Sequence, residues 1–302
     1  MKRIPKGIYP VMITPYTDNN KIDFDAVDHL VDFYAENGCQ GIFAVCQSSE
    51  MWYLDEDERV ELASRVVKAS NGRMCIVASG HISDSIDNQI KELKRISETG
   101  VDAVVMVSNR LAAKDEDDEV LISNMWKILN SLPNVTFGMY ECPYPYKRLL
   151  TDKVLEAMAL SGRFSFIKDT CCDADLIAHR VKVLNGRIQL FNANCTTMLD
   201  TLKAGADGFS GLMANFVPDI LVWLATHYID QPEKAQQVAS ILSLLSCVEG
   251  HSYPINAKYH MNLVGVPMKL HSRSRDERDF NTINHHEMHD FINVEQLVRS
   301  FL

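Results

Sequence analysis

The sequence lacks the features that mark a secreted or membrane-spanning protein. Its eight cysteines include no Cys-x-x-Cys pair, and most lie in or beside apolar runs, where a buried thiol behaves as a small hydrophobic group. No apolar stretch reaches the roughly 18 residues that span a bilayer. The start, Met1-Lys2-Arg3-Ile4-Pro5, leads into a strand-like segment without a signal peptide. We therefore expect a reduced, cytoplasmic protein with no membrane partner.

An excess of positive charge is also missing. The chain has 30 Lys and Arg against 40 Asp and Glu, which gives a formal net charge of -10 and disfavours a nucleic-acid partner. A small anionic substrate is still compatible with this charge, because local hydrogen-bond donors decide its binding. With 46% hydrophobic and 23% charged residues, the composition is that of a globular protein. A chain of 302 residues is long enough for a single α/β barrel.

Eight short apolar runs alternate with stretches of helical period. The runs lack clean polar alternation, which is typical of parallel strands covered on both faces. The predicted strands are Gly7–Ile13, Gly41–Val45, Met74–Ala78, Ala103–Val107, Val135–Met139, Phe164–Ile167, Ile188–Phe191 and Gly208–Ser210. The predicted helices between them start near Asp25, Asp55, Ser83, Asp115, Thr151, Asp173 and Thr196.

Repeated helix-to-strand junctions support this reading of the fold. Gly38, Gly100 and Gly205 each end a helical stretch two residues before a buried run, as expected where glycine adopts the left-handed conformation after a helix. Eight such units predict an α/β fold, a (β/α)8 TIM barrel with extra C-terminal helices; a doubly wound open sheet is the alternative. We expect residues 1–218 to form the barrel that carries the site. Residues 219–302 would then be a helical extension packed on it.

Three predicted strand ends carry polar groups that would meet at one mouth of a barrel. Lys168 ends the sixth strand, Tyr140 ends the fifth, and the loop Cys46–Glu50 follows the second. A lysine amine in a dry site can lose its proton and attack a carbonyl, while a phenol can move protons. Each group also has a simpler interpretation, as a solvated lysine, a packing tyrosine or a helix entry.

The order and spacing of these segments resemble the pyruvate-dependent class I aldolase superfamily of dihydrodipicolinate synthase and N-acetylneuraminate lyase. The resemblance covers about Gly7 to Pro218. The segments that carry it are Tyr9–Pro15, Ile22-Asp23, Cys46–Glu50, Leu54–Arg59, Tyr140–Pro143, Ile167–Thr170, Gly205–Gly208 and Asn215–Pro218. The resemblance implies a carbon–carbon lyase that binds pyruvate or another 2-keto acid together with an aldehyde, and assembles as a homotetramer.

The resemblance also implies roles for individual residues. Lys168 matches the Schiff-base lysine and Tyr140 the proton-shuttling tyrosine. Ser48 matches the second hydroxyl residue of the carboxylate-binding loop, and we expect it to be catalytic as the relay partner of Tyr140. Gln47 and Ser49 match its neighbours in that loop, where unpaired backbone N–H groups suit an anion. This imine chemistry requires no metal and no organic cofactor.

The sequence departs from the dihydrodipicolinate synthases where the second substrate binds. Pro145 stands at the position of their carboxylate-binding arginine, and Arg148 lies three residues further on. The tyrosine pair that they carry after the fourth strand is replaced by Val107-Ser108-Asn109-Arg110, in which Arg110 is either a substrate ligand or a plain surface residue. These departures count against dihydrodipicolinate synthase activity.

Other positions favour a sugar-acid lyase. Thr170 resembles the pattern of the sialate and sugar-acid lyases, and Ala193 and Ser210 match positions that line the family's site. Glu141 is unusual beside the tyrosine, and either contacts a hydroxylated substrate or pairs with Lys147 or Arg148. The expected substrate is a sugar-acid-like 2-keto-3-deoxy acid. The alternatives are a synthase or dehydratase that uses the same imine, and a barrel that binds a keto acid without turnover.

Neither the acidic nor the histidine clusters are interpreted as metal sites. The clusters at Asp55–Arg59 and Asp115–Glu119 suit helix N-termini, where the dipole favours carboxylates. His285, His286 and His289 fit an exposed tail helix, without the further ligands that a zinc site needs.

Overall fold

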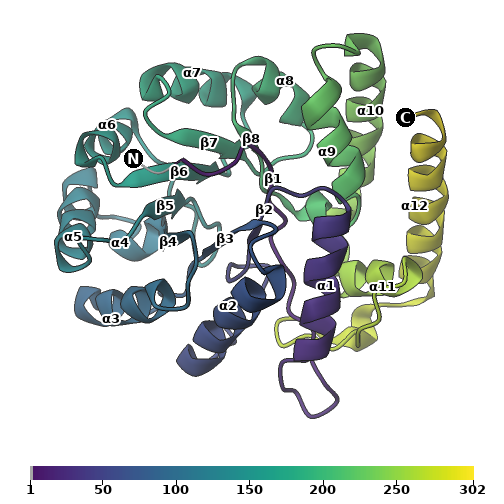
Figure 1. Ribbon diagram of the computed structural model, residues 1–302, viewed down its shortest axis with the longest axis horizontal. Helices are drawn as coiled ribbons and strands as arrows, with labels where there is room; N and C mark the ends of the chain where they lie inside the picture. The colour runs from purple at the N-terminus through teal and green to yellow at the C-terminus, as the bar shows by residue number, and fades with distance from the viewer. Residues whose placement is uncertain (1–2) are drawn as a thin grey trace.

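A computed structural model describes residues 3–302, so Met1 and Lys2 of the predicted leaderless start lie outside the described residues. Eight parallel strands stand at the centre and helices surround them (Figure 1). The (β/α)8 barrel and its C-terminal helices are thus confirmed. The strands are β1 (Gly7–Ile8), β2 (Gly41–Phe43), β3 (Cys75–Ala78), β4 (Ala103–Val107), β5 (Phe137–Tyr140), β6 (Phe164–Asp169), β7 (Gln189–Asn192) and β8 (Gly208–Phe209).

The sheet closes almost completely. Its order runs β1-β8-β7-β6-β5-β4-β3-β2, with all ladders parallel, and a single parallel bridge between Val11 and Phe43 connects its two edges. The first strand is shorter than predicted: β1 ends at Ile8, and Pro10, which has no N–H to donate to a ladder, follows two residues later. The register places Tyr140 directly beside Lys168 on neighbouring strands.

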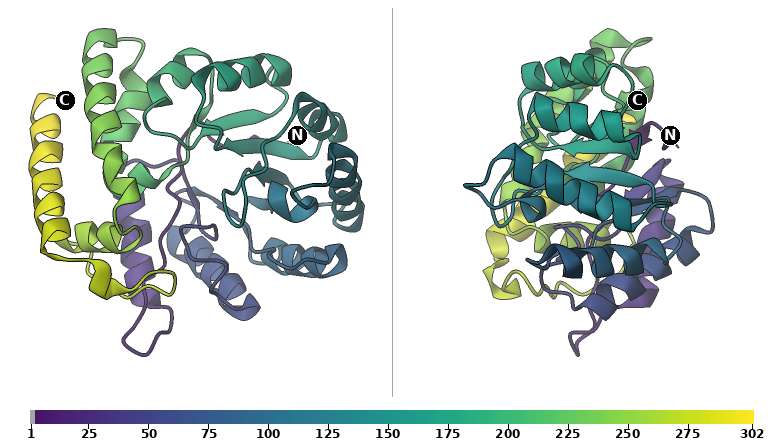
Figure 2. Two further views of the ribbon diagram at one scale, coloured as in Figure 1. Left: turned by 180° about the vertical axis from the view of Figure 1, so that it is seen from behind. Right: turned by 90° about the vertical axis from the view of Figure 1, so that its left-hand side faces the viewer.

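The helices lie around the sheet, as two further views show (Figure 2). Those of the barrel are α1 (Phe24–Glu36), α2 (Glu56–Ser70), α3 (Ile86–Ser97), α4 (Ser108–Leu111), α5 (Asp118–Ser131), α6 (Asp152–Ser161), α7 (Ala174–Leu184), α8 (Met198–Lys203) and α9 (Pro218–His227). The short α4 was not predicted. The acidic clusters cap helices: Asp55 and Glu58 form a capping box, and Asp117 accepts from the Val120 N–H.

The chain after β8 is helical. Beyond α9, its α-helices are α10 (Pro232–Leu245), α11 (Ile255–Leu263) and α12 (Thr282–Phe301). Its 3₁₀ turns are η1 (Leu212–Asn215), η2 (Ser246–Gly250) and η3 (Glu277–Asp279). The predicted boundary at residue 218 falls on the first residue of α9, which packs against β1 and α8. Arg299 of α12 pairs with Asp219 of α9, so the tail is tied to the barrel. None of the helices within residues 3–302 has the length and apolarity to cross a bilayer.

Candidate active site

A cavity of about 450 Å³ opens near the carboxyl ends of the strands. It brings together six of the residues predicted to form the site. They are Gln47, Ser48, Tyr140, Lys168, Thr170 and Ala193. This is the mouth at which barrel enzymes carry their chemistry.

Lys168 reaches the cavity from the end of β6 and is only 4% exposed. Its Nζ lies 4.2 Å from the centroid of the Tyr140 ring and 5.6 Å from that of Phe43. Removal of the ammonium from water lowers the pKa of Lys168 from 10.5 to about 8. The thiols of Cys46 and Cys142 and the carboxyl of Glu249 partly oppose that shift. The amine is therefore available as a nucleophile near neutral pH.

Tyr140 ends β5 beside the lysine. Burial raises the pKa of its phenol well above 10, so the hydroxyl keeps its proton and can donate it. The Phe43 ring meets it edge-on, with centroids 5.5 Å apart. The Cys142 thiol is hydrogen-bonded to the Tyr140 side chain and lies 3.3 Å from the Gln47 side-chain oxygen. Cys142 thus joins the tyrosine to the loop after β2.

The loop after β2 turns sharply around Ser49 and Glu50. The Ser49 hydroxyl lies within hydrogen-bond distance of the carbonyls of Met12 and Ala44, and it accepts from the Cys46 N–H, so it fixes the loop rather than lining the cavity. Glu50 adopts a left-handed φ of 59°. Ser48 does line the cavity, and its side chain shares a hydrogen bond with Tyr253.

The Glu50 carboxylate holds a distant segment over the same loop. Its Oε1 accepts from the backbone N–H groups of Arg273 and Ser274, each at 2.7 Å. The Arg273 guanidinium then binds both carboxylate oxygens of Glu58 at the start of α2. Arg275, at the cavity's edge, is carried on this tethered segment.

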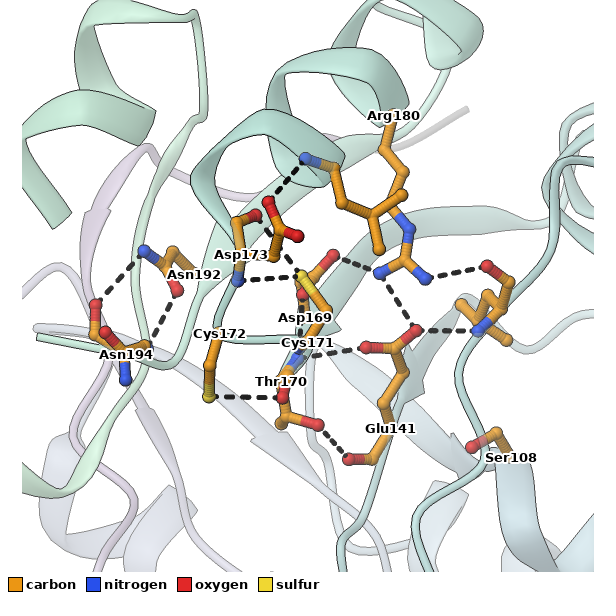
Figure 3. A network of polar contacts seen from close by, with 12 residues as sticks. Ser108, Glu141, Asp169, Thr170, Cys171, Cys172, Asp173, Arg180, Asn192 and Asn194 are labelled. Atoms are coloured by element: carbon orange, nitrogen blue, oxygen red, sulfur yellow. Dashed lines mark hydrogen bonds and ion pairs between the residues drawn. The ribbon is translucent and has the colours of Figure 1, made fainter. Parts of the chain in front are cut away.

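Glu141 belongs to a buried network beneath the cavity (Figure 3). Its carboxylate accepts from the N–H groups of Leu150 and Thr170, and it lies 3.0 Å from the Arg180 guanidinium, which also pairs with Asp169. The Thr170 hydroxyl donates to the Glu141 carbonyl at 2.6 Å. Because Glu141 follows Tyr140, and Asp169 follows Lys168, this network fixes the two strand ends that carry the reactive groups.

Other residues that the sequence suggested point elsewhere. Arg110 pairs with Asp84 and stacks 5.5 Å from the Trp52 ring, and Arg148 donates to the carbonyls of Ala113 and Glu116. Ser210 is buried beside the cavity without lining it.

The segment after β4 also folds inward. Asn109 in α4 has its side-chain nitrogen within 2.6–2.9 Å of the carbonyls of Cys142, Tyr144 and Tyr146. The segment Val107–Arg110 is therefore engaged with the chain after β5.

Sequence reasoning missed several residues that line the cavity, because they lie far along the chain or in loops. They are Trp52, Tyr53, Tyr144, Lys147, Asn194, Glu249, Tyr253, Ser274 and Arg275. Lys147 donates to the Thr170 carbonyl at 2.7 Å. The proximity of Lys147 to Thr170 could have been inferred from the predicted strand order. The position of Glu249 and Arg275 at the cavity could not.

The tail histidines pack against an aromatic ring. His285 and His289 meet the Tyr259 ring edge-on, with centroid separations of 4.5 and 6.0 Å. Within residues 3–302, no three His, Cys, Asp or Glu side chains cluster as metal ligands.

Comparison with known proteins gives a consistent result. The model of the dihydrodipicolinate synthetase family matches residues 4–275. A 4-hydroxy-tetrahydrodipicolinate synthase of Marinobacter nauticus is 25% identical over 269 residues, covering 87% of this chain and 91% of the relative. One of Methanocaldococcus jannaschii is also 25% identical, over 265 residues, covering 87% of this chain and 89% of the relative.

Solved structures share the fold. A crystal structure of a dihydrodipicolinate synthase superposes with a TM-score of 0.82 at 24% identity, covering 95% of this chain and 99% of the other. YagE, a prophage protein of E. coli K12 solved in complex with pyruvate, superposes with a TM-score of 0.87 at 19% identity, covering 97% and 99%. The predicted superfamily is confirmed, and with it the enzyme class, a pyruvate-dependent carbon–carbon lyase. The chain belongs to the dihydrodipicolinate synthetase family.

Proposed function

We propose that this protein forms an imine between Lys168 and pyruvate or a related 2-keto acid, and cleaves or forms the adjacent C–C bond of a sugar-acid-like 2-keto-3-deoxy acid. The observation that carries the proposal is the pairing of Lys168 and Tyr140 on adjacent strands, with the amine buried over the phenol ring in the cavity. A low-pKa amine beside a protonated phenol is what imine formation requires.

The chemistry follows from these groups. The neutral Lys168 amine adds to the C2 carbonyl, and the carbinolamine loses water to give an iminium. The C4 hydroxyl group loses its proton and becomes an aldehyde carbonyl as the electron pair of the C3–C4 bond moves to the iminium. This bond breaks, the aldehyde leaves and an enamine remains; protonation at C3 and hydrolysis then release pyruvate. Tyr140 moves the protons at the nitrogen and the C2 oxygen. The Ser48 hydroxyl and the backbone N–H groups of the loop from Gln47 to Ser49 hold the keto-acid carboxylate, and Ser48 relays protons with Tyr140.

The part of the cavity that would bind the second substrate is polar, and it differs from that of the dihydrodipicolinate synthases, where an arginine binds the substrate carboxylate. Pro145 replaces that arginine, and Arg148 is occupied by carbonyls away from the cavity. Gln47, Asn194 and Ser274 offer hydrogen bonds to substrate hydroxyls from several sides. These features favour a hydroxylated substrate. The matched relatives are named synthases, so a synthase or dehydratase using the same imine is the alternative.

Borohydride reduction in the presence of pyruvate tests the proposal. We expect a pyruvate adduct on Lys168, located by mass spectrometry, and none in Lys168→Ala. Lys258 is an internal control: burial lowers its pKa to about 8 as well, but it is fully buried outside the cavity lining, its Nζ donating to the His271 carbonyl. No adduct on Lys168, or an equal adduct on Lys258, would reject the imine.

Turnover then separates catalysis from binding. Enzyme that has not been treated with borohydride is assayed for pyruvate release from 2-keto-3-deoxygluconate and N-acetylneuraminate. An adduct on Lys168 with no release from any 2-keto-3-deoxy acid would favour the binding protein without turnover.

The proposal extends to a homotetramer in the cytoplasm, as the family resemblance implies. Light scattering after size-exclusion chromatography measures the assembly, and cell fractionation measures the location. A monomer in solution, or the protein in a membrane or secreted fraction, would contradict this part.

A further inference from the structure

One carboxyl group in the cavity is not used by the chemistry above. Glu249 lies in η2 and lines the cavity together with Lys168. The Met213 N–H donates to its carboxyl group, but its Oε1 is buried and has no hydrogen-bond partner among residues 3–302. An unpaired buried carboxyl oxygen is unfavourable by itself, and a hydroxyl group of a bound substrate would satisfy it.

The groups around Glu249 suit proton transfer. The positive charge of Lys168, on β6, stabilises the Glu249 carboxylate. The negative charge of Glu249 in turn contributes to raising the pKa values of Tyr253 and Cys195. Burial raises the pKa of Glu249 from 4.5 to about 7, so near neutral pH it exists in both protonation states. A group of this kind can accept a proton in one direction of a reaction and donate it in the other.

Tyr140 and Glu249 reach the cavity from different parts of the chain. Tyr140 is paired with Lys168 on the adjacent strand and so serves the lysine nitrogen and the C2 oxygen of the bound keto acid. The C4 atom of a bound substrate lies two carbons beyond the imine carbon. Glu249 reaches the cavity from η2, which packs against η1 after β8.

We infer that Glu249 is the catalytic acid–base for the hydroxyl group at C4 of a 4-hydroxy-2-keto acid bound to Lys168. In cleavage, the C4 hydroxyl proton passes to the Glu249 carboxylate, the C4–O bond becomes the aldehyde carbonyl, and the C3–C4 electron pair moves to the iminium to give the enamine. In synthesis, protonated Glu249 returns the proton to the aldehyde oxygen as the bond forms. The inference rests on the proposed imine and specifies the substrate class as one with a C4 hydroxyl.

Glu249→Gln tests this with the full-length protein, because the amide oxygen can still accept from the Met213 N–H. The protein is incubated with 2-keto-3-deoxygluconate, reduced with borohydride, and the mass of the Lys168 adduct is measured. The unmodified protein is expected to carry the three-carbon pyruvate adduct. The variant is expected to carry mainly the intact six-carbon adduct, with cleavage slowed by about 10²-fold or more.

A second readout isolates the imine step. Exchange of the pyruvate methyl protons in D2O, followed by NMR, depends on Lys168 and Tyr140 and is expected to change by no more than about threefold in Glu249→Gln. Glu233→Gln is the matched control, because Glu233 is exposed at the start of α10. It should behave as the unmodified protein in both assays.

The outcomes separate the inference from the function on which it rests. The same three-carbon adduct at the same rate in Glu249→Gln, or an intact adduct in both proteins, would overturn the role of Glu249 and leave the imine standing. Absence of any pyruvate adduct in the unmodified protein would instead reject the proposed function.

Discussion

The Nζ of Lys168 lies 4.2 Å from the centroid of the Tyr140 ring, and the two residues are register partners on β6 and β5. In a parallel sheet, neighbouring strand ends point to the same rim, so the register alone brings the amine and the phenol together. The electron-rich ring face stabilises the ammonium, but the loss of water outweighs this effect and the pKa of the lysine falls.

The first prediction concerns pH. Only the neutral amine attacks, so the rate of reductive trapping by pyruvate and cyanoborohydride should rise with pH and level off with an apparent pKa of about 8 for Lys168. Below that value it should fall about tenfold per pH unit. The quantity to measure is the initial rate of adduct formation between pH 5.5 and 9.5, corrected for the rate with a small amine. An inflection near 10 would contradict the dry environment of Lys168.

Tyr140→Phe should separate proton transfer from the site's shape. The ring keeps its edge-on contact with Phe43, but the hydroxyl group that moves protons is lost. We expect adduct formation and pyruvate methyl-proton exchange to slow by about 10²-fold or more, with a much smaller change in the KM for pyruvate. Phe33→Leu, which changes a partly buried residue of α1 away from the cavity, is the control. Unchanged exchange in Tyr140→Phe would remove the phenol from the mechanism.

The sequence was enough to predict the parts that depend on strand order. Buried runs and glycine-ended helices predicted eight units, and Lys168, Tyr140 and Ser48 then fell at one mouth because barrel strands are parallel. Glu249 and Arg275 could not be predicted, since they come from irregular segments after β8 whose path is set by tertiary contacts such as those of Glu50 with Arg273 and Ser274.

Glu141 could be located from the sequence, but its partner could not. Its position beside Tyr140 suggested either a substrate contact or pairing with a nearby Lys147 or Arg148, but its partner is Arg180, about forty residues away on α7. No local spacing indicates that pairing, which depends on how α7 packs against β7 and the neighbouring helices.

Arg275 gives a prediction about the second substrate. Its side chain has an exposed position at the edge of the cavity, on the segment that Glu50 tethers. Arg275→Gln should raise the KM for a 2-keto-3-deoxy acid with a terminal carboxylate by about tenfold, which corresponds to an exposed charge-assisted contact. The KM for pyruvate should not change. A steady-state comparison of a uronic-acid-derived substrate with its uncharged analogue measures this, and an equal effect on both would contradict it.

Arg180→Met tests the buried network beneath the cavity. Glu141 and Asp169 are fully buried, and Arg180 is the cation that lies against both. Its removal leaves two carboxyl groups without their counter-charge, which should lower the free energy of unfolding by about 3–5 kcal/mol, measured by urea denaturation.

The pH dependence of that loss has a defined sign. Burial and the neighbouring Asp169 already raise the pKa of Glu141 from 4.5 to about 7, and loss of Arg180 removes the charge that opposes this rise. A carboxyl group whose pKa is higher in the folded than in the unfolded state keeps more protons when folded, so stability falls as pH rises between the two values. The variant should therefore be less destabilised at pH 5 than at pH 8. Arg187→Met, which breaks the exposed pair with Glu156, should change stability little at either pH. A loss for Arg180→Met that is as small as the Arg187 control, or equal at the two pH values, would mean that water or local rearrangement compensates the two carboxyl groups.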